Sequence, residues 1–295
     1  MAALSCLDSK QNLGVSECKK LPQLIKGMIT TPENYTITAA LAASAAQWQS
    51  DIKLAKNQRI YLWPQWAVNS ENISEEQIVE ETPLTAIGVR AGQYRFRLLY
   101  RENLELHKAM YSHRNSGGRV FLIDNENKII GTSSDGGTTL KGFLLDSILP
   151  EKIMFSDGSN ASKTGVNIFL ADNEELDLYG VQLDGSSFVN SVLPLTTAVI
   201  GIVGTPATDE IIVDVYSKLD NVPVSGLVVA DFNLLDGAGA AQSISTVTES
   251  STVEGRYTLA PTTTFASGTI ALVAASSLSI DQPFETIAST TVTVA

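Results

Sequence analysis

The stretch Ser156–Gly165, SDGSNASKTG, contains the residues of this chain that most resemble a binding or catalytic motif. It ends in the pair Lys163–Thr164 after a run of small residues, as phosphate-binding loops of the form G-x-x-x-x-G-K-[ST] do. In those loops glycines let backbone amides close around phosphate groups, but here Asp157 and Ser162 stand at the two glycine positions. The carboxylate of Asp157 would face the phosphates, and VNIFLA follows where such a loop opens a helix. We therefore predict a polar turn between two strands.

The two histidines, His107 and His113, are six positions apart, which on a helix is a rotation of about 240°. They would face different sides of a helix and could not share a metal ion. Neither has a serine or cysteine in a recognisable nucleophile arrangement. We expect both to be polar or packing residues.

Two acidic segments have the composition of functional sites without the required partners. DNENKIIG, which begins at Asp124, would offer Asp124 and Glu126 to a calcium ion, but the third ligand position is Lys128. We predict a hairpin turn there, between the strands RVFLID and KIIGTS. EEQIVEE, Glu75–Glu81, has four glutamates and no partner that would raise the pKa of one of them. We expect a solvated face that repels polyanions.

Two further pairs complete the residues that could do chemistry. Trp63 and Trp66, on either side of Pro64, could stack on sugars or bases, but we expect them to anchor a loop or a subunit contact. Cys6 and Cys18 lack the spacing of a zinc site; they could close a small disulfide loop, although we favour two reduced thiols. The sequence thus predicts no catalytic, cofactor-binding or metal-ligating residue, no cofactor and no enzymatic activity.

The charge of the chain limits its partners. Its 295 residues carry a net charge of −12, which does not suit a protein that grips phosphate backbones through clustered Lys and Arg. Residues 191–295 have ten acidic side chains against Lys218 and Arg256, a net of −8, which leaves −4 for the first 190 residues. We expect no signal peptide, because MAALSCLDSKQNLG lacks a basic segment followed by an apolar core. We also expect no membrane insertion, because the longest weakly polar run, 193–204, is shorter than the ~20 residues of a membrane span.

The elements that would position these residues are mostly strands. We expect an extended arm over 1–35, a helix near 37–56 and a shorter helix near 102–113. The first helix is predicted from one apolar stripe at steps of three and four residues: Ile37, Leu41, Ala45, Trp48, Ile52 and Ala55. In GQYRFRLLY (92–100), aromatic and aliphatic residues alternate with Arg95 and Arg97, as in a strand with one buried face. Regularly spaced short strands favour a β-sandwich or barrel-like domain over 36–192.

The composition changes after Gly185, where long charged residues become rare and Thr, Ser, Val and Ala increase. LPLTTAVIGIVGTPAT has two prolines and two glycines, so we predict a linker over 193–207. Six or seven short β-branched strands follow over 208–295, which suits a small sandwich.

Two resemblances follow from these segments. GGRVFLIDNENKIIGTSSDG, together with LKGFLLDSILPEKIMFSDGSNASKTGVNIFLADNEELD, resembles the tail tube proteins of tailed bacteriophages over about Gly117–Asp177. VPVSGLVVADFNLLD, followed by STVTESSTVEGRYTLAP, is similar to bacterial immunoglobulin-like domains of the invasin type. In that comparison Gly255 and Tyr257 lie near the expected tyrosine corner, while the cysteine pair and core tryptophan of antibody domains are missing.

The resemblance implies a structural virion protein whose copies form stacked, hexameric rings of a tail tube that conducts DNA without binding it specifically. The loop from Pro64 to Pro83 and the arm would hold ring to ring. The immunoglobulin-like domain would project outward and contact host-surface polymers weakly. Two other roles remain open: a capsid decoration or head–tail neck protein, and a bacterial surface adhesin, which the C-terminal domain alone would suit.

Overall fold

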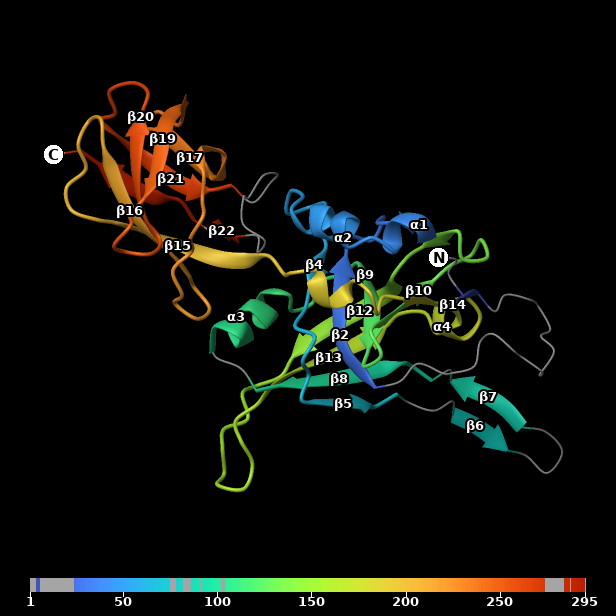
Figure 1. The fold of residues 1–295 in the computed structure, drawn as a ribbon. Helices are drawn as coiled ribbons and strands as arrows, with labels where there is room; N and C mark the ends of the chain where they lie inside the picture. The colour runs from blue at the N-terminus through green and yellow to red at the C-terminus, as the bar shows by residue number, and fades with distance from the viewer. Residues whose placement is uncertain are drawn as a thin grey trace. The chain divides into compact units, whose positions relative to one another are not determined.

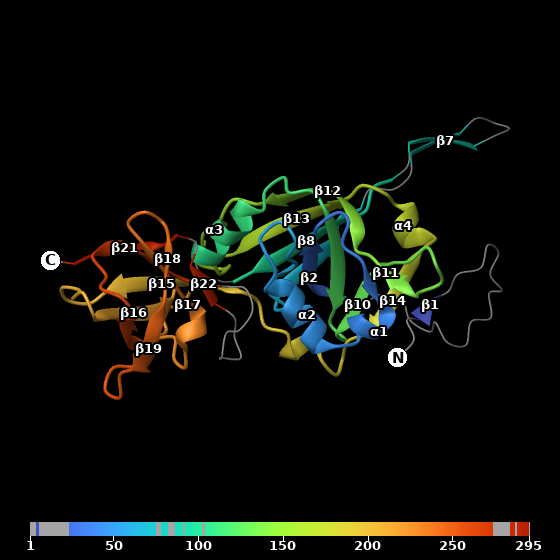
Figure 2. The ribbon, with the colours of Figure 1, turned by 90° about the horizontal axis from the view of Figure 1, so that it is seen from above.

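The computed structural model describes residues 4–5, 24–74, 78–81, 86–90, 92–101, 104–273, 284–286 and 288–294. They form a mainly β protein with few helices, as the sequence predicts (Figures 1 and 2). The chain divides into two compact units: the first is Met1–Asp51 with Lys56–Val192, and the second is Leu193–Ala295 with Ile52–Ala55. Separate hydrophobic clusters form on the two sides of Leu193.

Before Leu193 most of the chain is strand. The strands are β1 (Leu4–Ser5), β2 (Ile25–Thr31), β3 (Ile37–Thr38), β4 (Tyr61–Leu62), β5 (Asn69–Asn72), β6 (Ile78–Glu81), β7 (Ala86–Arg90), β8 (Arg95–Tyr100), β9 (Arg119–Asp124), β10 (Lys128–Thr132), β11 (Thr139–Leu140), β12 (Phe143–Pro150), β13 (Thr164–Leu170) and β14 (Gly180–Asp184). The helices are α1 (Ala39–Ala42), α2 (Ala45–Ile52), α3 (Leu104–Ser112), α4 (Glu174–Asp177) and the short 3-10 helix η1 (Val189–Ser191).

Strand β9 is at the centre of the first unit. It pairs antiparallel with β2, β10 and β12, and five of its six residues are buried. Val120 and Leu122 point into the main core, whereas the ring of Phe121 on the opposite face meets Trp48 of α2 edge-on, with 5.5 Å between ring centroids. Burial on both faces explains why RVFLID is an unbroken apolar run instead of an alternating one.

The sheet curves around its core into a barrel-like form. At its start β12 pairs with β9, and from Leu145 onward it pairs with β13, with a bulge between Leu145 and Ser147. The segment between β4 and β5 bridges β2 and β8. Ala67 N–H donates to the Lys26 carbonyl in β2 at 3.2 Å, and Val68 N–H donates to the Leu99 carbonyl in β8 at 2.8 Å.

The helix predicted near 37–56 is wrong as a single element. Ile37 and Thr38 form β3, which pairs with β11, and the helical part is broken into α1 and α2. The Thr38 side chain caps α1 by accepting the Leu41 N–H. The indole N–H of Trp48 donates to the Ala42 carbonyl at 2.8 Å, so that this carbonyl is satisfied at the break by a side chain. The apolar stripe therefore follows two short helices.

Two extended segments predicted from the sequence also need correction. The arm predicted over 1–35 includes β1, which pairs with β14, and β2, a strand of the barrel. Strand β2 shows no alternating pattern because nearly all of it is buried and a bulge at Lys26 shifts its register. The loop predicted from Pro64 to Pro83 contains β5 and β6, and β5 adds to the sheet beside β8.

The second unit is a two-layer β-sandwich. Its elements are β15 (Thr196–Ile202), β16 (Ile211–Ser217), η2 (Val229–Asp231), β17 (Phe232–Asp236), β18 (Ala241–Gln242), β19 (Ile244–Glu249), β20 (Arg256–Pro261), β21 (Ser267–Leu272), β22 (Phe284–Thr286) and β23 (Thr290–Thr293). One sheet has the order β19-β20-β16-β15-β22 and the other β18-β17-β21-β23. Side chains from both sheets, among them Val213 and Ile270, form one core.

The linker predicted over 193–207 is corrected by β15. This strand pairs with β16 and β22, so most of the segment belongs to the sandwich. Ala198 and Ile200 alternate into the core, and the two prolines, Pro194 and Pro206, lie outside the strand. Along the chain, the first compact unit ends at Val192 and the second continues from Leu193.

A buried tyrosine ties one edge of the sandwich together. The hydroxyl of Tyr257 donates to the Val224 carbonyl at 2.6 Å and accepts the Leu227 N–H at 3.2 Å, while its side chain is fully buried. Gly255, two residues earlier, has φ +72°, and a Cβ there would lie 2.7 Å from the Val215 carbonyl oxygen. This is the corner that the sequence places near Gly255 and Tyr257.

Replacing Tyr257 with phenylalanine leaves the ring in place but leaves one carbonyl and one N–H without a partner. We expect Tyr257→Phe to lower the free energy of unfolding by about 1–3 kcal/mol. Urea-induced unfolding followed by circular dichroism measures this change. Tyr216→Phe on β16 is the matched control, because the Tyr216 hydroxyl has no hydrogen bond within the described part of the chain. Equal unfolding midpoints for the two variants would contradict the role of the corner.

Candidate assembly surfaces

The stretch around Lys163 is a turn between strands, as predicted. Met154 and Lys163 form an antiparallel bridge with two N–H to carbonyl bonds of 2.9 Å, and β13 follows directly. Asp157 accepts the N–H groups of Ser159 at 3.0 Å and Asn160 at 2.7 Å. The carboxylate that stands at the first glycine position thus closes its own turn, and no helix begins here to support a phosphate.

His107 and Thr164 form the one histidine–hydroxyl contact that could be mistaken for a catalytic pair in the described chain. Nδ1 of His107 lies 2.7 Å from Oγ1 of Thr164, which is a nucleophile–base distance. Thr164 is only 3% exposed, however, so its hydroxyl does not reach a substrate. The contact fastens α3 to β13.

His113 lies in a separate aromatic cluster. Its ring centroid is 4.8 Å from that of Tyr61 and 5.2 Å from that of Trp63. Burial lowers the pKa of His113 because the charged imidazolium loses water there. The structure also separates the tryptophan pair: Trp63 is buried and its indole N–H donates to Thr30 Oγ1 at 3.2 Å, while Trp66 is 53% exposed.

The acidic DNEN segment forms the turn of the β9–β10 hairpin, as predicted. Oδ1 of the fully buried Asp124 accepts the N–H groups of Glu126 at 2.9 Å and Lys128 at 2.8 Å. The Lys128 ammonium pairs with the Glu126 carboxylate at 2.6 Å. Oδ1 of Asp124 and the carboxylate of Glu126 are used within the turn, so the sequence pattern reflects hairpin geometry.

Several predicted residues cannot be placed. Cys6 and Cys18 lie outside the described residues, as do residues 75–77 of the Glu75–Glu81 segment. The rest of that segment is the backbone of β6. In the described ranges no three His, Cys, Asp or Glu side chains are grouped so as to hold a metal ion. Among the same residues no helix has the length and apolar character to cross a membrane.

A charged network covers the outer face of the sheet formed by β5, β8 and β13. Phe96 and Leu98, on either side of Arg97 in β8, point into the core. Because side chains alternate along a strand, Arg97 points to the other face. Its guanidinium bonds both oxygens of Glu151, at 2.8 and 2.9 Å, and Glu71 of β5 at 3.0 Å. Burial alone would raise the pKa of Glu151, but hydrogen bonds from Arg97 and Asn167 outweigh it and lower that pKa. Sequence alternation predicted the face, but it could not predict these partners.

The first unit has open strand edges. Strand β5 is the last strand of its sheet and pairs only with β8 among the described strands. Strands β6 and β7 form a two-stranded ladder that pairs with no other described strand. Each of these edges presents backbone N–H and carbonyl groups that can pair with another chain.

The connection between β12 and β13 projects from the first unit and is drawn yellow-green in Figure 1. Residues 155–162 of this projecting loop are all exposed. At its start Phe155 is 81% exposed, the largest value among the exposed large apolar residues of the described chain. An aromatic side chain with so little burial contributes little to the fold of its own subunit.

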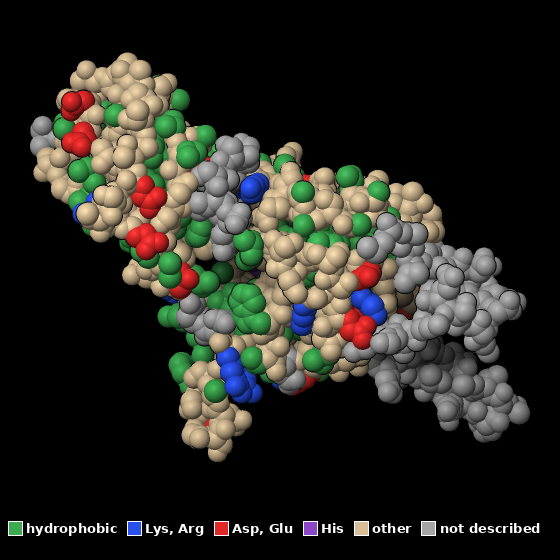
Figure 3. Space-filling view, viewed as in Figure 1, with side chains coloured by type: hydrophobic (Ala, Val, Ile, Leu, Met, Phe, Trp, Pro, Cys, Tyr) green, Lys and Arg blue, Asp and Glu red, His purple; other side chains and the backbone are tan. Residues whose placement is uncertain are grey.

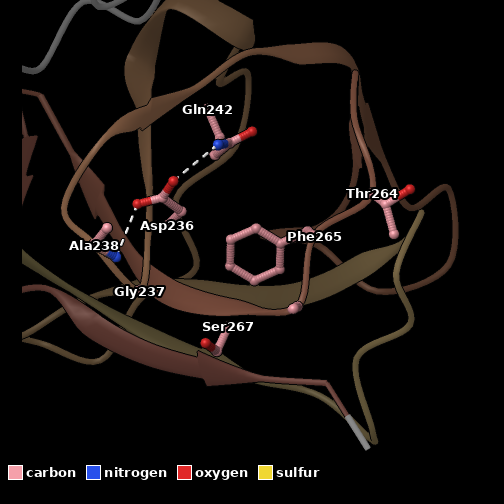
Figure 4. A pocket seen from close by; sticks show the side chains of 8 residues that line it. Asp236, Gly237, Ala238, Gln242, Thr264, Phe265 and Ser267 are labelled. Atoms are coloured by element: carbon pink, nitrogen blue, oxygen red, sulfur yellow. Dashed lines mark hydrogen bonds between the residues drawn. The ribbon is translucent and has the colours of Figure 1, made fainter.

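The second unit has a hollow lined by both polar and apolar residues (Figure 4). It has a volume of about 300 Å³ and lies beside Phe265 and the β17–β18 turn. The carboxylate of Asp236 accepts the N–H groups of Ala238 at 2.9 Å and Ala240 at 2.8 Å, and the Gln242 amide at 3.2 Å. The turn itself uses this carboxylate, so Asp236 is not available to fix a ligand in the hollow. Acidic side chains are spread over this unit on the face drawn in Figure 3.

Comparison of the chain with protein-family models, curated proteins and solved structures gives no match. The strongest candidates for function in the first unit are surfaces, namely the open edges of β5 and β6–β7 and the projecting loop.

His113 gives the protein a testable pH dependence. Because folding lowers the pKa of His113 below its ordinary value of 6.5, the unfolded chain binds more protons once the pH falls below that value. We expect the free energy of unfolding to decrease between pH 7 and pH 5. Denaturant unfolding at several pH values measures this, and His113→Phe removes the decrease while His107→Gln retains it. A wild-type protein equally stable at both pH values would contradict the expectation.

Proposed function

We propose that this chain is a structural subunit of a tailed bacteriophage, and that copies of its first unit assemble into rings that stack as the tail tube. Six copies per ring is the order that the resemblance implies. DNA would pass through the tube without specific binding. The observation that carries the proposal is the set of open strand edges on the first unit.

A two-stranded ladder of four and five residues, such as β6–β7, is at best marginally stable in water when it stands alone. The edge of β5 adds a second set of unpaired backbone groups, and the neighbouring Val68 is 47% exposed. Natural proteins normally cover or block such edges, because uncovered ones aggregate. Pairing with a neighbouring copy would cover them and extend the sheet from subunit to subunit.

The pairing edges differ from one another, since β5 belongs to the barrel and β6–β7 does not. Contacts between two different surfaces of identical subunits are head-to-tail contacts, and these form a ring when the rotation closes. The projecting loop with Phe155 supplies a separate contact, which we assign to the neighbouring ring. This division of contacts supports rings that stack.

The charge of the chain supports conduction of DNA without adhesion. A net charge of −12 repels a polyanion, and the Arg97 guanidinium is already held by Glu71 and Glu151. The second unit, with its net charge of −8, would project outward from the tube and contact host-surface polymers weakly. In this proposal the protein is located in the virion.

Negative-stain microscopy of the purified full-length protein at increasing concentration tests the proposal. We expect rings and stacked tubes. Single rings that never stack would instead support the neck role, and persistent monomers at high concentration would contradict both.

Phe155→Ser tests the projecting loop directly. Burying one phenylalanine side chain is worth about 2 kcal/mol, so the concentration needed for tube formation should rise about thirtyfold. The melting temperature should stay the same, because Phe155 is 81% exposed within its subunit. Val222→Ser, at a 52% exposed valine of the second unit, is the matched control and should assemble normally. Unchanged sedimentation of Phe155→Ser would remove the loop from the assembly.

A further inference from the structure

Two side chains that the proposed assembly does not use, Lys26 and Asn127, contact each other where β2 passes the β9–β10 turn, and a buried carboxyl stands at the start of that turn. Lys26 lies at the bulge of β2, between Ile25, which pairs with Asp124, and Gly27, which pairs with Ile123. The Lys26 ammonium donates to Oδ1 of Asn127, 101 positions later in the chain. The site thus brings an amine from strand β2 and a carboxamide from the β9–β10 turn into contact.

The third group is the carboxyl of Asp124, which is fully buried. Its Oδ1 accepts the N–H groups of Glu126 and Lys128, but its Oδ2 is buried without a hydrogen-bond partner in the described structure. A buried carboxylate oxygen without a hydrogen-bond partner lowers the stability of the folded protein, so its presence calls for an explanation such as a catalytic role. Burial lowers the pKa of the Lys26 ammonium, and the negative charge of Asp124 partly offsets this lowering.

An amine, a carboxamide and a buried acid are the groups that an amide transfer requires. From this geometry we propose that Lys26 and Asn127 join in an intramolecular isopeptide bond. The neutral Nζ of Lys26 attacks Cγ of Asn127, and the bond from Cγ to Nδ2 breaks. Asp124 takes the proton from the attacking nitrogen and gives it to the leaving nitrogen, which departs as ammonia. No oxidant, reductant or other reactant is needed, and Asp124 is regenerated.

The bond would fasten β2 to the β9–β10 turn across most of the first unit. Closing a loop of this size restricts the unfolded chain in the way that a disulfide does, and it does not depend on the redox conditions. Strand β2 could then not be pulled from the barrel without breaking a covalent bond. The inference stands on these three residues and is independent of whether the protein forms tubes.

The test is the intact mass of the purified full-length protein, followed by peptide mapping. The wild-type chain should be lighter than its sequence by about 17 Da, one ammonia, and a proteolytic fragment should contain the Lys26 and Asn127 peptides joined. Lys26→Arg should show the full mass. Lys128→Arg, at the neighbouring lysine that pairs with Glu126, is the matched control and should still lose ammonia.

Asp124→Asn tests whether the carboxyl of Asp124 is needed as a proton carrier, because the variant keeps the size of the side chain but removes the acid. We expect the full mass and two separate peptides. Circular dichroism shows whether this variant folds, and if it does not, Lys26→Arg and Lys128→Arg still decide the question. A wild-type chain of full mass would overturn the proposal. A loss of ammonia that persists in Lys26→Arg would overturn it too, because the loss would then come from a cyclised asparagine elsewhere.

Discussion

Unpaired backbone groups along the strand edges of the first unit constrain how this protein can remain stable in water. Each N–H and carbonyl at an edge needs a partner in water or in protein, and a flat edge invites another strand. The barrel satisfies its own groups around β9, where three strands pair with one, and it closes through the segment that links β2 to β8. Among the described strands of the first unit, the two-residue strands β1 and β4 pair on one side only, and so do the longer β5 and the strands of the β6–β7 ladder. A subunit built to join its copies has a use for the longer edges, whereas an isolated monomer would have to protect them.

The charged groups of the first unit serve packing more than chemistry. Arg97, Glu151 and Glu71 satisfy one another on the outer face of the sheet, and Asp157 and Asp124 each close a turn through backbone amides. These are the residue types that make active sites, but most of their polar groups are already used in hydrogen bonds within the fold, and Oδ2 of Asp124 is an exception. The same holds in the second unit, where Asp236 caps its own hairpin. Surfaces are therefore the better candidates for function in the described structure.

Local patterns predicted local structure well. The alternation around Phe96 and Leu98 predicted the buried face of β8. The DNEN segment predicted a hairpin turn, and the residues after Lys163 predicted a strand, and the structure has both. The main failures were caused by contacts between distant residues. The predicted long helix is shorter at its start because Ile37 and Thr38 pair with β11, and β2 lacks an alternating pattern because it is buried on both faces and carries a bulge. Likewise, no spacing in the sequence brings Lys26 to Asn127, because the register of β2 against β9 sets that contact.

The most direct test of the central claim is hydrogen exchange, resolved by peptide and measured on the full-length protein when dissociated and when assembled. If copies of the chain cover the open edges, amides in the peptides that span β5 and β6–β7 should exchange much more slowly in the assembled state, while those of β9 should be slow in both. Unchanged exchange along β5 and β6–β7 in assembled protein would contradict the claim, because the subunits would then be held together by some other surface.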